Sequence, residues 1–137
     1  MKAQFSHVHW GRVVRTGVLV DILIVILNTV LSFLIFLVLG QLDQGQTASQ
    51  VASWSTTILA LLLTAYGAER VARKVESGAT LHGFLVGLVA ALIFFLLGLV
   101  FLAFGARLDL LALVHFVLMV AAGWLGGVLG SRGRGKS

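Results

Sequence analysis

Long apolar stretches separated by short polar segments make up most of this sequence. Four of them, at about residues 17–40, 51–70, 80–104 and 110–131, carry almost no charge. An apolar run of roughly 18 residues or more is long enough to cross the ~30 Å hydrocarbon core of a bilayer as a helix. A helix also satisfies its own backbone polar groups, which lipid cannot do. The pattern therefore predicts an all-α, polytopic membrane protein whose four transmembrane helices form two hairpins.

The polar segments divide the chain into three parts. The first part, residues 1–16, is predicted to lie at the cytoplasmic interface. Residues 17–131 are predicted to form a single four-helix transmembrane domain, and residues 132–137 a basic cytoplasmic tail. Segment 67–83 holds the strongest concentration of charge inside the apolar region. We interpret it as the hinge that joins the two hairpins.

Composition favours lipid as the solvent of this protein. Hydrophobic residues make up 59% of the chain and charged residues only 11%, whereas a soluble domain carries about 25% charged residues. The net charge of +5 would suggest nucleic-acid binding in a soluble protein. Here the basic residues flank apolar segments and no recognition motif is present, so no nucleic-acid partner is expected. Because the chain has no Cys, disulfides and thiolate metal sites are excluded.

The distribution of Lys and Arg predicts the orientation in the membrane. All of the 10 basic residues except Arg107 fall beside the two termini or in the hinge. Short loops rich in Lys and Arg stay in the cytoplasm, so both termini and the hinge should be cytoplasmic, in the inner membrane of a bacterium. Arg70, Arg73 and Lys74 of the hinge could also contact anionic lipid headgroups. The simpler interpretation, which is compatible with this one, is a solvated helix end with its own Glu69–Arg73 pair.

A narrow polar stripe is predicted on the first helix. At 100° per residue, Asp21, Asn28 and Ser32 share one face, which should point toward protein because lipid cannot satisfy it. Asp21 has two interpretations. It could form an ion pair with the flanking Arg15 or with an arginine of the hinge, or it could belong to a proton or cation path.

Small residues recur at helical spacing on the third and fourth apolar segments. Gly83, Gly87, Gly123 and Gly127 would let helix backbones approach closely, which drives packing in lipid. The sequence also resembles itself at two offsets, between residues 17–21 and 83–87 and between 67–73 and 126–132. These matches indicate either a parallel duplication of the hairpin or the self-similarity that apolar composition produces by itself.

The histidines give no metal site. His7 and His9 could chelate a metal only with further ligands, and none is near them in the sequence. His82 and His115 are expected to be hydrogen-bonded inside the bundle at opposite depths. Neither a nucleophile–base pair nor a metal-ligand cluster is present, and the loops are short, so we expect no enzyme activity and no cofactor.

Four motifs carry a resemblance to a known group of proteins. They are His-Trp-Gly-Arg at residues 9–12, Gly-Ala followed by basic residues at 67–74, Leu-His-Gly-Phe-Leu-Val-Gly at 81–87, and the Gly-rich segment at 126–132. Together they resemble a family of small, uncharacterised bacterial four-helix membrane proteins. The resemblance implies the fold and no activity, and Asp21 lies outside its pattern.

The sequence favours a non-enzymatic structural or accessory membrane protein. We expect it to assemble with itself or with a larger complex through its Gly and Ala seams, with anionic lipids at its cytoplasmic face. The alternative is a small oligomeric transporter or channel that uses Asp21, Asn28 and Ser32 as a polar path.

Overall fold

Four long helices account for nearly all of the described chain. The computed structural model describes residues 8–41, 45–103 and 110–133. Its helices are α2 (Trp10–Leu39), α3 (Gln46–Arg73), α4 (Ala79–Ala103) and α5 (Leu110–Arg132), and these described ranges contain no strand. All four helices are long and apolar enough to cross a membrane, which confirms the predicted all-α architecture.

Two helices begin earlier than the apolar pattern predicts. α2 begins at Trp10 rather than at residue 17, so much of the predicted interfacial lead is the start of the first crossing helix. Val13 explains this extension, because it is fully buried in a cluster with Ala68 and Val71 of α3. α3 begins at Gln46 rather than 51, directly after Gly45, whose positive φ of 81° turns the chain into the helix.

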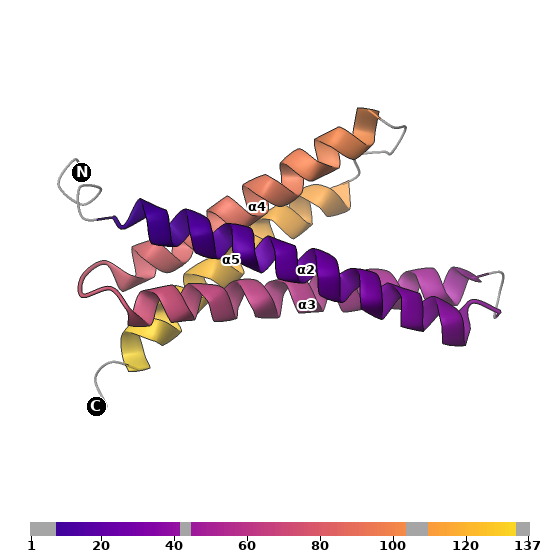
Figure 1. The fold of residues 1–137 in the computed structure, drawn as a ribbon, viewed down its shortest axis with the longest axis horizontal. Helices are drawn as coiled ribbons and strands as arrows, with labels where there is room; N and C mark the ends of the chain where they lie inside the picture. The colour runs from indigo at the N-terminus through magenta and orange to yellow at the C-terminus, as the bar shows by residue number, and fades with distance from the viewer. Residues whose placement is uncertain (1–7, 42–44, 104–109, 134–137) are drawn as a thin grey trace.

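The two hairpins meet at one end of the molecule and diverge toward the other. α2 and α3 form one hairpin and α4 and α5 the second, and α3 packs against all three other helices. Figure 1 shows the start of α2, the α3–α4 turn and the end of α5 at the same end, while α4 leads away from α2 and α3 toward the opposite end. The C-terminal half of α2 therefore packs mainly on α3, and it exposes many apolar side chains.

Glycines bring α4 and α5 into direct backbone contact. A Cβ on Gly87 would lie 2.8 Å from Cα of Gly123, and a Cβ on Gly83 would collide with the backbone of Gly127. α5 also presents Gly130 to α3, where a Cβ would lie 2.8 Å from the carbonyl oxygen of Glu69. In lipid, where no hydrophobic effect drives helices together, such close approach is a principal source of packing energy.

The packing of the hairpins does not follow a twofold axis. Such an axis would exchange α2 with α4 and α3 with α5. Contact between α3 and α4 would then require an equal contact between α2 and α5, but these two helices make at most a marginal one. Gly17 of α2 packs on Val89 of α4, whereas Gly83, which the repeat would align with it, packs on α5. The packing thus gives no support to a parallel internal repeat.

We predict that Gly87→Ala destabilises the bundle. The added methyl group has to push the backbones of α4 and α5 apart, and overpacking of this kind costs about 1–3 kcal/mol. Gly98→Ala is the matched control on the same helix, because its Cβ would meet no atom of the described residues within 4 Å. Thermal unfolding in mild detergent should show a lower midpoint for Gly87→Ala alone. Equal midpoints for the two variants would contradict the assigned seam.

Candidate functional site

Asp21 lies in the interior of the bundle and not at a charged surface. Only 7% of its surface is exposed, and its Oδ2 has no hydrogen-bond partner among the described residues. The predicted ion pair is wrong for the part of the chain that the structure describes. Arg15 lies roughly 120° around the helix from Asp21, and Arg73 instead pairs with Glu69 at the exposed end of α3.

Two other polar groups share this lack of a partner. Oγ1 of Thr64 on α3 and Nε2 of His115 on α5 are buried and unpaired within the described residues. The ring of His115 stacks on Phe94 with centroids 4.5 Å apart. The prediction that His115 is hydrogen-bonded is therefore wrong at Nε2 for the residues that the structure describes.

The three unpaired groups border one core cluster. This cluster consists of Val20, Ile24, Ala60, Ala90, Ala91 and Met119. Asp21 lies between two of its members on α2, Thr64 lies one helical turn from Ala60, and His115 lies one turn from Met119. Polar groups that are buried in a membrane without hydrogen-bond partners are costly. The surroundings of this cluster therefore hold the described interior's unpaired polar side-chain atoms.

Asn28 and Ser32 form a separate polar group with α3. Oδ1 of Asn28 accepts hydrogen bonds from Oγ of Ser32, at 3.3 Å, and from Oγ1 of Thr56. Thr56 was missed by the sequence reasoning, because nothing in the spacing of α3 shows which of its hydroxyls faces α2. Asp21 lies two helical turns away and does not join this group. The predicted stripe is thus divided into a buried carboxylate and a half-buried amide cluster.

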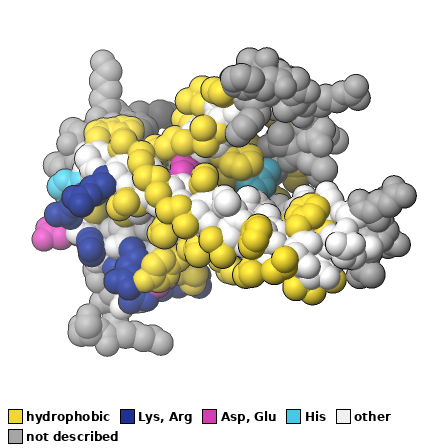
Figure 2. Space-filling model, turned by 45° about the vertical axis from the view of Figure 1, so that its right-hand side comes forward, with side chains coloured by type: hydrophobic (Ala, Val, Ile, Leu, Met, Phe, Trp, Pro, Cys, Tyr) yellow, Lys and Arg dark blue, Asp and Glu magenta, His cyan; other side chains and the backbone are white. Residues whose placement is uncertain are grey.

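Basic side chains gather at the end of the bundle that carries the termini, as Figure 2 shows on one face. Between α2 and α3 they line an open cleft of about 650 Å³. Its lining residues are Arg12, Arg15, Thr16, Leu19, Arg70, Val71 and Lys74. Of the three predicted lipid contacts, the structure places Arg70 and Lys74 in this cleft and leaves Arg73 outside its lining. Arg12 and Arg15 were missed, because nothing in the pattern of apolar residues shows that α2 begins early enough to reach the hinge.

The α3–α4 turn is held by His82. Its Nε2 accepts a hydrogen bond from the backbone N–H of His9 at 3.2 Å, so its Nδ1 carries the proton that is donated to the carbonyl oxygen of Gly78 at 2.9 Å. Gly78 has a positive φ of 65°, a conformation that glycine adopts without strain. His82 therefore ties the start of α2 to the hinge, and both its ring nitrogens are occupied.

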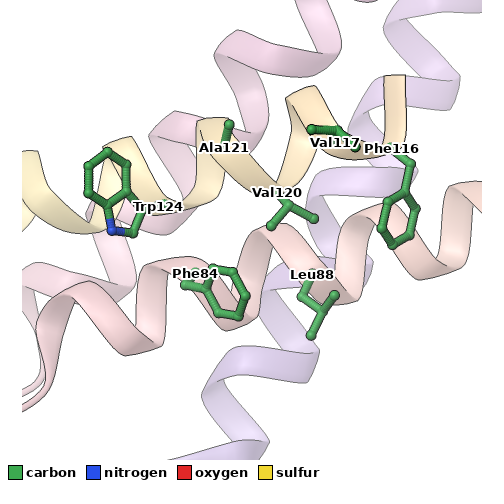
Figure 3. Close-up of a pocket in the computed structure, with 7 residues that line it drawn as sticks. All are labelled: Phe84, Leu88, Phe116, Val117, Val120, Ala121 and Trp124. Atoms are coloured by element: carbon green, nitrogen blue, oxygen red, sulfur yellow. The ribbon is translucent and has the colours of Figure 1, made fainter. Parts of the chain in front are cut away.

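An apolar groove of about 400 Å³ runs between α4 and α5 (Figure 3). It is lined by Phe84, Leu88, Phe116, Val117, Val120, Ala121 and Trp124. In Figure 3 the rings of Trp124 and Phe116 stand at opposite ends of the groove, with Phe84 and Leu88 between them. Such a lining suits hydrocarbon and offers no acid, base or nucleophile.

Within the described residues, no group of three His, Cys, Asp or Glu side chains could hold a metal ion. His9 uses its backbone N–H to bind His82. His7, the other histidine weighed as a metal ligand, lies outside the described residues.

The fold and these sites define a multi-pass, four-helix membrane protein. Residues 12–130 match the family described as "Protein of unknown function (DUF3792)", and the chain belongs to that family. The match extends from the first turns of α2 to the end of α5, and it confirms the expected membership of an uncharacterised family. Neither the curated proteins nor the solved structures contain a match to this chain.

Proposed function

We propose that this chain is a non-enzymatic accessory protein of the bacterial cytoplasmic membrane, which assembles with itself or with a larger membrane complex. The Gly seams that were expected to serve this assembly are occupied inside the chain, where α5 packs on α3 and α4. A partner therefore needs another surface. The observation that carries the proposal is the unpaired end of the Asn28 amide on α2.

Both known contacts of Asn28 fall on the same atom of its side chain. Ser32 and Thr56 approach Oδ1, and no described residue pairs with Nδ2. The hydroxyl of Thr56 also lies 2.8 Å from the carbonyl oxygen of Ala52, so its single proton is donated either to that oxygen or to Oδ1 of Asn28. Turning the amide around would let its N–H groups donate to the two hydroxyls, but it would leave the carbonyl end unpaired. One end of the amide lacks a partner in either orientation.

The position of Asn28 makes this unpaired end significant. Exposed apolar side chains precede and follow it on α2, among them Ile26, Leu27 and Val30. A half-buried amide in such a place would face lipid that can neither donate nor accept a hydrogen bond. Polar side chains at this depth commonly bond to a neighbouring helix. We infer that a polar group on a partner helix completes the bonding of Asn28.

The gathering of basic residues supports the orientation that belongs to this proposal. Arg12 and Arg15 on α2, Arg70 and Arg73 on α3, and Arg132 on α5 all lie at the end where the termini and the α3–α4 turn meet. The positive-inside rule applies to short loops of this kind. Both termini would then be cytoplasmic.

Asn28→Leu should weaken the assembly. Loss of one intramembrane polar contact costs about 0.6–1.7 kcal/mol, which corresponds to a roughly threefold to twentyfold weaker association. The measurement is the intact mass of the complex extracted from native membranes in mild detergent. Thr29→Val is the matched control, because Thr29 is exposed and its hydroxyl is already bonded to the carbonyl oxygen of Val25 at 2.8 Å.

The same measurement on the purified, reconstituted chain separates the two kinds of partner. A complex that re-forms from this chain alone contains a second copy, and one that is seen only in native membranes contains another protein. A monomer in both preparations, or a complex that Asn28→Leu leaves intact, would contradict the proposal.

The orientation can be measured with single cysteines, since the chain has none of its own. Ser49 at the start of α3 and Ser77 in the α3–α4 turn are both exposed. A membrane-impermeant maleimide should label Ser49→Cys on intact cells and Ser77→Cys only after the membrane is permeabilised. The reverse pattern would place both termini outside.

A small transporter is the second candidate function, and the buried, unpaired Asp21 favours it. On this alternative, Asp21→Asn abolishes proton or cation flux in proteoliposomes. The substitution also removes an uncompensated carboxylate, so the bundle should unfold at the same temperature as the parent or higher. Glu69→Gln, at the exposed pair with Arg73, is the control that leaves flux unchanged. Unchanged flux in Asp21→Asn would exclude Asp21 as the coupling residue.

A further inference from the structure

The basic cleft between α2 and α3 brings together side chains that are far apart in the sequence. Arg12 and Arg15 come from the first turns of α2, and Arg70 and Lys74 come from the end of α3. Nη1 of Arg12 donates a hydrogen bond to the backbone carbonyl of Lys74 at 3.2 Å, which joins the start of α2 to the end of α3 beside the cleft. The cleft therefore lies between two helices that a hydrogen bond holds together.

The charge of this cleft is not balanced by its own lining. Four of its lining residues are basic and none is acidic. Glu69 of α3 pairs with Arg73 outside the cleft, and Glu76 lines a neighbouring cleft that shares Arg12 and Lys74 with this one. No described residue pairs with the charged groups of Arg15 or Lys74. Like charges held this close repel one another, so the cleft favours an anion.

Two of the basic groups are held in position. Nε and Nη2 of Arg70 donate to the hydroxyl of Tyr66, and its guanidinium lies 5.0 Å from the centre of that ring. Arg12 is fixed by its bond to Lys74. Arginine groups that are already oriented lose less freedom when they bind an oxyanion, and their planar donors match a phosphate.

Besides Thr16, the remaining lining of the cleft is apolar. It consists of Val71, which is buried, and Leu19, which is 49% exposed and precedes the long apolar part of α2. One turn further along α2, Leu23 is exposed in the same way. A ligand that fits this lining carries an anionic group at one end and hydrocarbon at the other.

We propose that this cleft binds an anionic phospholipid. The headgroup phosphate lies among Arg12, Arg15, Arg70 and Lys74, and an acyl chain runs from Leu19 along the exposed face of α2. Inorganic phosphate shares the headgroup chemistry, but it would gain nothing from the apolar edge. The site goes beyond the proposed accessory role and does not depend on it, because it requires no protein partner.

The test is native mass spectrometry of the full chain in mild detergent, titrated with phosphatidylglycerol or with phosphatidylcholine. Phosphatidylglycerol should bind more tightly. The double variant Arg15→Gln/Lys74→Gln should weaken its binding about 25-fold, at roughly fivefold for each basic residue. The matched control is Arg73→Gln/Arg132→Gln, which removes the same charge from residues outside the cleft lining, and it should stay within about twofold of the parent.

Three results would overturn the proposal. They are equal weakening by the two double variants, equal binding of the two lipids, and displacement of phosphatidylglycerol by millimolar inorganic phosphate. If the cleft double variant does not fold, Arg15→Gln is compared with Arg132→Gln, with a fivefold loss expected for the first alone. Loss of lipid binding would leave the mass of the protein complex unaffected. The lipid titration can therefore contradict the lipid site without contradicting the proposed assembly, and the mass of the Asn28→Leu complex can do the reverse.

Discussion

Backbone contact between α4 and α5 is the constraint on which the rest of the structure depends. Lipid chains are as apolar as leucine, so helices in a membrane gain little from burying leucine against leucine. Gly83 and Gly87 face Gly127 and Gly123 with no side chain between them. Dispersion contacts between two backbones at that distance are numerous, and each is lost when a single methyl group intervenes. The α4–α5 pair is therefore the packed unit against which the other two helices are placed.

α3 joins the core through the same kind of contact, and α2 through a looser one. Gly130 of α5 meets the backbone of α3 directly, whereas Gly17 and Gly67 meet the valine side chains Val89 and Val20. α2 is accordingly the most exposed of the four helices over its apolar span. Asp21 and Asn28 both lie where α2 contacts the rest of the chain. Asp21 lies in the N-terminal half of α2, where the helix contacts α3 and α4. Asn28 lies in the C-terminal half, where α2 contacts α3.

The number and type of the helices could be predicted from the sequence because they depend on the chain's local composition. An apolar run of sufficient length in lipid has to be a helix whatever surrounds it. The four glycines of the α4–α5 seam could also be identified as packing positions from their spacing. Their partners could not, since the same spacing serves contact within one chain or between two. The structure places these contacts inside the chain and so removes them from the surfaces open to assembly.

The polar residues were harder to predict because their environment depends on tertiary geometry. Asp21 lies close to Arg15 in the sequence, but the helical rotation between them separates the two side chains. Arg12 and Arg15 reach the hinge because α2 extends toward the N-terminus, and the burial of Val13 against α3 holds this extension in place. The basic cleft thus results from an apolar contact. Burial of Val13 aligns the first turns of α2 with the last turns of α3, and two basic segments that are remote in the sequence then face a common space.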